Sequence, residues 1–118
     1  MQYLLLCYAN EGEWEAMSPP RQQAIGVAIE QIVQDAMQRG QLRALGRLEP
    51  TATSSTVRER NGTLLTTDGP FAETREQLGG YYLVDCQDLD EALALAGRLA
   101  GCRPGGVIEV RPLRPSYR

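Results

Sequence analysis

The apolar run YLLLCY, residues 3–8, constrains the fold more than any other segment of this chain. The run is too short for a stable helix, and its leucines and terminal tyrosines are typical of a strand. Successive side chains of a strand point to opposite faces, so Leu4 and Leu6 share one face while Leu5 and Cys7 share the other. Both faces are apolar. We therefore expect an interior strand of a sheet that is covered on both sides.

A long amphipathic helix is predicted next, after a loop that contains Asn10 and Trp14. Ser18 is placed to cap the helix, and Pro19 suits the first helical position because no backbone donor is needed there. Gly40 is expected just past the end of the helix. Apolar residues at three- and four-residue spacing predict one buried stripe: Ile25, Ala28, Ile29, Ile32, Val33, Ala36 and Met37.

A second helix is predicted between Asp88 and Gly101. Asp88 and Glu91 have the spacing of a capping box, in which each side chain accepts a hydrogen bond from the backbone N–H of the other residue. Gly101 is expected to end the helix. Its predicted buried stripe consists of Leu89, Ala92, Leu93, Ala96 and Leu99.

The remaining segments predict strands and one hairpin. Asn61-Gly62 suits the positive φ angles of a type I′ turn, so residues 57–60 and 63–66 are expected to pair. Single strands are predicted at residues 42–48, 80–84 and 107–110. The resulting order is strand, helix, strand, hairpin, strand, helix, strand. This order predicts an α+β protein with a ferredoxin-like antiparallel sheet, two helices on one face and an inserted β-hairpin.

The two predicted helices leave one face of the sheet without a cover. The first strand is nevertheless apolar on both faces, so something else must bury the second one. A second copy of the chain is the simplest cover. We therefore predict a homodimer in which sheet packs on sheet, with a cleft where the two subunits meet.

The composition suits a single domain that spans residues 1–118. The three cysteines have neither disulfide-framework nor zinc-site spacing. Because 15 acidic residues outnumber 12 basic ones, we predict no direct nucleic acid binding, and we interpret Arg111, Arg114 and Arg118 as a solvated tail. No apolar run approaches the roughly 18 residues of a membrane span, so we predict no membrane association and a cytoplasmic location.

The segment TDGPFAET, residues 67–74, joins turn residues to carboxylates and is the candidate functional site. As a turn residue, Asp68 would accept the backbone N–H of Phe71 or a later donor, because Pro70 has none. As a catalytic base, Asp68 would lie at the mouth of the cleft, where Phe71 limits water and raises the basicity of the carboxylate. The spacing alone leaves both interpretations open.

Ligand contacts are predicted for Phe71, Glu73, Tyr81 and Tyr82. Glu73 follows Asp68 closely enough for the two carboxylates to share a proton. Tyr81 and Tyr82 alternate on one strand, so one faces the helices and only the other reaches a ligand in the cleft, although both also suit sheet packing. The acidic residues match no calcium-loop spacing, and Arg75 offsets their charge. We therefore predict no metal and no cofactor.

Five segments resemble the signature of the DGPF family, the YCII-related domains: residues 3–6, 67–74, 77–82, 88–93 and 108–112. The resemblance covers nearly the whole chain. It implies a ferredoxin-like domain that pairs into a dimeric α+β barrel, in a family whose members mostly lack an assigned reaction.

The absence of histidine limits what this resemblance implies about chemistry. Some relatives in the wider superfamily carry a histidine and aspartate pair thought to act as an acid/base couple, and that mechanism cannot be carried over. Two functions stay open. One is a small-molecule enzyme in which Asp68 transfers a proton, assisted by Glu73 or a tyrosine hydroxyl. The other is a non-catalytic module that binds a ligand or a partner, since related domains are often encoded beside or fused to sigma-factor-like transcription subunits.

Overall fold

The computed structural model describes residues 1–115, so Arg118 of the predicted tail lies outside the described residues. The main sheet has the strand order β2-β5-β1-β6, and every neighbouring pair is antiparallel. Its strands are β1 (Gln2–Ala9), β2 (Leu42–Arg47), β5 (Gln77–Asp85) and β6 (Val107–Pro112). The predicted α+β class and ferredoxin-like sheet are confirmed.

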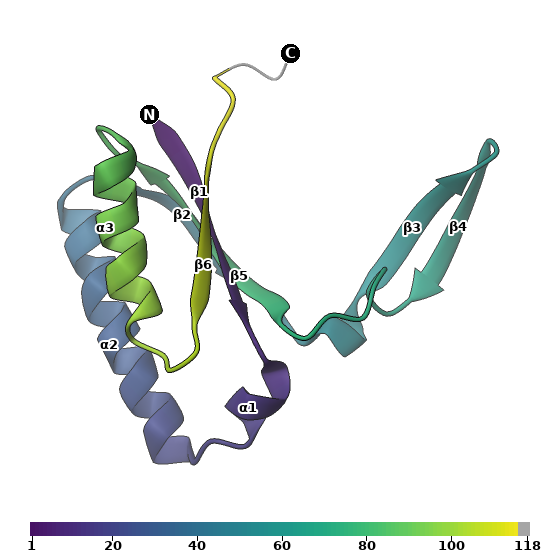
Figure 1. Cartoon of the computed structure of the whole chain (residues 1–118), viewed down its shortest axis with the longest axis horizontal. Helices are drawn as coiled ribbons and strands as arrows, with labels where there is room; N and C mark the ends of the chain where they lie inside the picture. The colour runs from purple at the N-terminus through teal and green to yellow at the C-terminus, as the bar shows by residue number, and fades with distance from the viewer. Residues whose placement is uncertain (116–118) are drawn as a thin grey trace.

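The two long helices, α2 (Pro19–Gln38) and α3 (Leu89–Ala100), lie on the same side of the main sheet (Figure 1). Each begins at its predicted cap. The Ser18 hydroxyl accepts a backbone N–H at 3.3 Å, and the Asp88 carboxylate accepts the N–H of Glu91 at 2.9 Å. Within the described chain, no element covers the opposite face of the sheet (Figure 1).

The capping box at the start of α3 is only half formed. Asp88 makes its expected bond, but the Glu91 carboxylate accepts from the side-chain amide of Gln41 at 2.7 Å. Gln41 precedes β2, and its carbonyl oxygen also accepts the N–H of Asp85 at 2.7 Å. Glu91 thus links the helix to the start of β2 instead of closing its own cap.

A short helix, α1 (Glu11–Glu15), replaces the loop predicted after the first strand. The loop prediction was wrong because Asn10 acts as an N-cap, and its side-chain oxygen accepts the N–H of Glu13 at 3.0 Å. This helix occupies the connection from β1 to α2 (Figure 1).

The hydrophobic core lies between the sheet and the two long helices. Leu5 of β1 and Val84 of β5 are fully buried in it, with Tyr3 beside them. The buried core residues from the helices are Ala36, Ala92, Leu95, Ala96 and Leu99. Leu42, Tyr82, Ile108 and Val110 pack against this cluster from the sheet.

The predicted helix stripes were wrong at three positions. Met37, Leu89 and Leu93 are exposed, whereas Leu95, which the stripe omitted, is buried. The buried stripe of α3 consists of Ala92, Leu95, Ala96 and Leu99, and Leu93 lies to one side of it. Leu89 is the first residue of α3. Met37 lies in the last turn of α2, next to the buried Ala36.

The predicted hairpin is confirmed and forms a separate sheet of β3 (Ser55–Arg60) and β4 (Thr63–Asp68). Asn61 and Gly62 have φ angles of 52° and 80°, as a type I′ turn requires. We call residues 55–68 the arm. A short 3₁₀ helix, Thr51–Thr53, precedes it.

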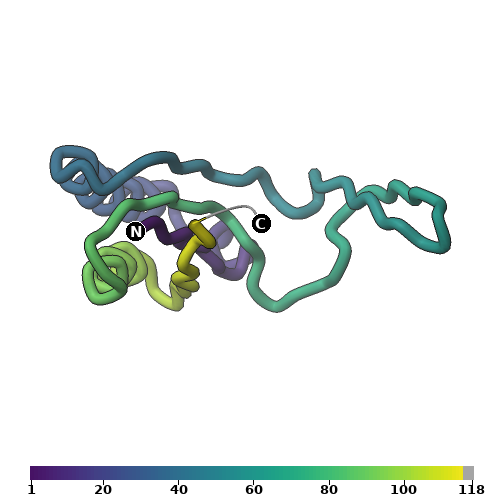
Figure 2. The backbone as a smooth tube through the Cα atoms, turned by 90° about the horizontal axis from the view of Figure 1, so that it is seen from above, coloured from purple at the N-terminus to yellow at the C-terminus, as the bar shows by residue number. Residues whose placement is uncertain are grey.

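The arm projects away from the main body in two perpendicular views (Figures 1 and 2). The radius of gyration is 16.3 Å, against about 13 to 14 Å for a compact domain of this length. Every residue of β4 is exposed. The arm therefore contributes nothing to the core of its own chain.

A bulge interrupts the pairing of β1 with β5. Cys7 opposes Gly80 and Tyr8 opposes Leu78, so Gly79 is the extra residue of β5. The bulge accounts for the Gly79-Gly80 pair, which the sequence also allowed as a point of ligand approach.

Candidate functional site

The turn after the arm is held by backbone groups and a threonine. Gly69 has a φ angle of 93°, which favours glycine. Its N–H donates to the carbonyl oxygen of Ser54 at 2.6 Å, and its own carbonyl oxygen accepts the hydroxyl of Thr56 at 2.8 Å. These bonds cross the base of the hairpin and direct the chain away from β4.

Asp68 is the last residue of β4 and is exposed. Among the described residues its carboxylate accepts no hydrogen bond, so the bond expected from Phe71 or a later donor is not formed. In the arm register Asp68 opposes Ser55 and Thr66 opposes Val57, which places Asp68 on the same face as Val57 and Leu64. The carboxylate is free to interact outside its own turn.

Phe71 and Glu73 follow Asp68 on an exposed segment, and the Phe71 side chain is 78% exposed. Thr74 shapes the end of this segment, because its hydroxyl donates to Glu76 and its carbonyl oxygen accepts from the Gln77 side chain, both at 2.6 Å. Among residues 1–115, no three His, Cys, Asp or Glu side chains gather closely enough to hold a metal ion.

Tyr81 and Tyr82 lie on opposite faces of the main sheet. Tyr82 packs against the core on the helix side, where burial raises the pKa of its hydroxyl. Tyr81 lies on the other face, with its ring directly over Gly46 of β2. A site within one chain therefore cannot include both tyrosines.

The face that carries Tyr81 is apolar at its centre, over β1 and β5, while β6 adds Glu109 opposite Leu6 and Arg111 opposite Leu4. We call it the bare face, and its half-buried residues are Leu4, Leu6, Tyr8, Tyr81 and Leu83. The five predicted site residues are thus divided among three places: the end of the arm with the exposed segment that follows it, the bare face, and the helix side of the sheet.

The structure adds an anchor at the base of the arm that the sequence did not indicate. The Glu11 carboxylate accepts the backbone N–H and the hydroxyl of Thr51 at 2.8 and 2.9 Å. The backbone N–H of Glu11 donates to the Gln77 side chain at 2.9 Å, and the Asn10 amide donates to the carbonyl oxygen of Arg75 at 3.0 Å. Residues on both sides of the arm are therefore tied to α1.

The other side of α1 is fixed by Arg103. Its guanidinium lies 4.9 Å from the centre of the Trp14 ring and donates to the carbonyl oxygen of Asn10 at 3.2 Å. Burial lowers the pKa of Arg103, although the side chain stays charged. Only the capping pattern at Asn10 could have pointed to this helix in advance.

The whole chain resembles known proteins. The family model of the YCII-related domain matches residues 1–116. The chain belongs to the YCII-related domain family. An uncharacterised protein of Rhizobium meliloti (strain 1021) is 40% identical over 114 residues, which are 96% of this chain and 92% of that protein. The resemblance to YCII-related domains is therefore confirmed.

Chemistry in this YCII-related domain depends on groups other than imidazole, since the chain has no histidine. Its three cysteines are free, and burial raises the pKa of the Cys7 thiol to about 11, so that thiol is protonated at neutral pH. Carboxylate, tyrosine and arginine side chains remain as candidates. No helix within the described residues has the length and apolarity to cross a bilayer.

Proposed function

We propose that this YCII-related domain acts as a homodimer that binds a small molecule where its two subunits meet, with Asp68 as the group that exchanges a proton with the ligand. The observation that carries the proposal is the bare face, an apolar surface without a cover among the described residues. Monomeric proteins rarely expose contiguous apolar surface of this kind.

Packing two bare faces together buries the same side chains in both copies. Leu4 opposes Leu83 and Leu6 opposes Tyr81 across β1 and β5, so the centre of the face is a continuous apolar patch. Sheets that pack face to face lie about 10 Å apart, a distance that leucine and tyrosine side chains fill from both sides. In a dimer with two-fold symmetry the same surface of each subunit forms the interface, so a single contact covers the bare faces of both copies.

The arm supports the same assembly. A two-stranded hairpin is marginally stable on its own, yet here it carries Val57 at 63% and Leu64 at 70% exposure on one face. The arm leaves the body on the side away from the helices, which is the side of the bare face (Figure 1). The arm would therefore point toward a partner subunit packed on that face. Asp68 lies on the same face of the arm as Val57 and Leu64.

Proton exchange is assigned to Asp68 because its carboxylate has no bond to its own turn. Covering by a second subunit would desolvate the carboxylate and raise its basicity. Tyr81, on the bare face, is the tyrosine whose hydroxyl would assist Asp68 once a second subunit brings the two groups together. Phe71 is exposed in the single chain, and a second subunit packed over this segment would bury it and exclude water from the carboxylate.

The assembly is tested with three glutamate variants by size-exclusion chromatography with light scattering at micromolar concentration. Leu6→Glu places a charge on the bare face and Leu64→Glu places one on the Val57 face of the arm, so both are expected to give monomers because buried unpaired charges are costly. Leu65→Glu is the matched control, since Leu65 lies on the opposite arm face. A monomeric wild type, or a monomeric Leu65→Glu beside a dimeric Leu64→Glu, would overturn the arrangement.

The role of Asp68 is tested by thermal-shift screening of wild type and Asp68→Asn against a panel of metabolites. A ligand specific for the folded state raises the melting temperature, and loss of the shift in Asp68→Asn supports the assignment. Turnover of such a ligand that Asp68→Asn abolishes, with an unchanged melting temperature, supports acid/base chemistry. Turnover that Asp68→Asn leaves intact would exclude Asp68 as the base.

The second candidate function is a non-catalytic module that binds a ligand or a protein partner in a transcription-regulatory setting. It is favoured by one observation: among the described residues, no titratable side chain lies within hydrogen-bond distance of the Asp68 carboxylate to act with it. A ligand that shifts the melting temperature through Asp68 but is never converted would favour this function.

A further inference from the structure

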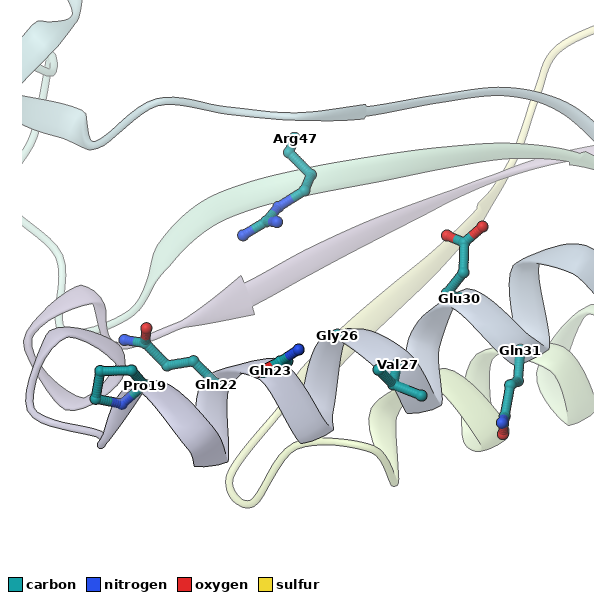
Figure 3. Close-up of a pocket in the computed structure, with 8 residues that line it drawn as sticks. All are labelled: Pro19, Gln22, Gln23, Gly26, Val27, Glu30, Gln31 and Arg47. Carbon is teal, nitrogen blue, oxygen red and sulfur yellow. The ribbon is translucent and has the colours of Figure 1, made fainter.

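An open groove of about 580 Å³ lies between α2 and Arg47 of β2, on the helix side of the sheet. The Arg47 side chain extends from the strand toward the helix, and the Glu30 side chain extends from the helix toward the sheet (Figure 3). The groove is on the opposite side of the sheet from the bare face, so it is separate from the proposed dimer contact.

The polar groups of the groove have unused hydrogen-bonding capacity. The ion pairs of the described residues engage Arg39, Arg43, Arg98 and the N-terminus, and none of them includes Arg47. One carboxylate oxygen of Glu30 accepts from Gln34 at 2.8 Å, which leaves the other oxygen available. Gln22 donates its amide to the carbonyl oxygen of Trp14 at 2.7 Å and keeps its own side-chain oxygen as an acceptor.

An apolar wall completes the groove. Val27 of α2 lines the groove and is 53% exposed, and Pro19 lines one end of it. Gly26, next to Val27, has no atom within 4 Å of the position that a Cβ would take, so the helix surface is open there. Exposed apolar surface beside two opposite charges suits a ligand that carries both a positive and a negative group on an apolar body.

The charges indicate which class of ligand fits. A guanidinium binds a carboxylate through two parallel hydrogen bonds, and Arg47 is free to do so. A phosphate dianion would be repelled by Glu30, whereas an ammonium group would be attracted to it. The fields of both residues also act on Tyr82: burial raises the pKa of its hydroxyl most, Arg47 lowers it and Glu30 raises it.

We propose that this groove binds an amino acid with an apolar side chain, whose carboxylate pairs with Arg47, whose ammonium group pairs with Glu30 and whose side chain lies against α2 at Gly26 and Val27. This assignment does not depend on the dimer or on Asp68.

The first test is a thermal-shift titration with L-phenylalanine and L-leucine as probes. A ligand at about ten times its Kd is expected to raise the melting temperature of a domain of this size by about 5 °C. L-phenylalaninamide lacks the carboxylate and 3-phenylpropionate lacks the ammonium group, so both are expected to give smaller shifts than L-phenylalanine. Absence of a shift with both amino acids at about 10 mM, a concentration that would detect even millimolar affinity, overturns the proposal.

Variants locate the site. Arg47→Gln is expected to lose the L-phenylalanine shift, whereas Arg58→Gln, which removes an exposed arginine of the arm, keeps it. The Glu30→Gln variant is expected to bind 3-phenylpropionate and L-phenylalanine with equal affinity, because its glutamine carries no charge to attract the ammonium group. Amide chemical-shift changes on adding L-phenylalanine should fall on Gly26 and Val27. An equal shift in Arg47→Gln and wild type, or chemical-shift changes confined to other elements, would refute the site.

Discussion

Replacing Gly46 by alanine tests the placement of Tyr81 on the bare face. A Cβ at this position would lie 2.6 Å from Cε1 and 2.9 Å from Cζ of the Tyr81 ring, closer than carbon atoms approach each other in folded proteins. The ring must then move. Overpacking costs about 1 to 3 kcal/mol in a well-packed core, and this is the upper limit here because the ring on the bare face can turn away. Alanine recovers about 0.5 to 1 kcal/mol of backbone entropy relative to glycine. The net destabilisation is therefore at most about 2.5 kcal/mol.

The assay is thermal unfolding followed by circular dichroism. With an unfolding entropy of about 2.1 cal/mol/K per residue, Gly46→Ala should lower the melting temperature by up to about 10 °C. Gly97→Ala is the matched control, because no atom lies within 4 Å of the added Cβ in α3. That change should raise the melting temperature by about 2 to 4 °C, since alanine is favoured over glycine in a helix.

A double-mutant cycle identifies the cause. In a Tyr81→Ala background the ring is absent, so Gly46→Ala should become neutral or slightly stabilising. If the alanine is equally harmful in both backgrounds, the ring does not lie over Gly46 and the assignment of Tyr81 to the bare face loses its basis. The same result follows if Gly46→Ala stabilises the wild type.

Three further predictions concern capping, thiol chemistry and pH. Asp88→Ala should cost about 1 kcal/mol in thermal or urea unfolding through loss of the bond to Glu91, while Asp88→Asn should be nearly neutral. Cys7, whose pKa burial raises to about 11, should react with iodoacetamide at neutral pH roughly a hundredfold more slowly than an unperturbed thiol, as measured by mass spectrometry. The hydrogen bond from Arg98, followed by the bond and charge of Arg39, lowers the pKa of Asp35 in the folded protein. Its stabilising contribution is therefore present above the unfolded pKa and is lost as pH falls through the folded one, so the melting temperatures of wild type and Asp35→Asn should converge below about pH 4.

Local signals in the sequence were sufficient for most of the fold. Asn61-Gly62, Ser18 and Asp88 act through bonds to residues only a few positions away, so their roles follow from spacing alone. Spacing alone did not decide whether Leu93 or Leu95 is buried. Both are leucines on one helix, and the buried face depends on how α3 packs against the sheet. That contact is a tertiary property.

The candidate site was less predictable for the same reason. Alternation placed Tyr81 and Tyr82 on opposite faces, but their assignment to faces depends on the register of β5, which contains the bulge at Gly79. The sequence placed Asp68 in a turn past the predicted strand of residues 63–66, whereas β4 continues to Asp68. The sequence could not indicate that Gly69 and Thr56 would hold the turn without the carboxylate, because those bonds cross the hairpin base.

The anchor at α1 explains how an arm without core contacts of its own can take part in specific assembly. Glu11 binds Thr51 before the arm and contacts Gln77 after it, so both ends of the excursion are fixed to the same helix. Arg103 holds that helix in turn, through Trp14. Because the direction of the arm is set within one chain, a partner would not have to order it on binding, and preorganisation of this kind lowers the entropic cost of association. The exposed Leu64 face and the anchored base would therefore act together in the proposed dimer contact.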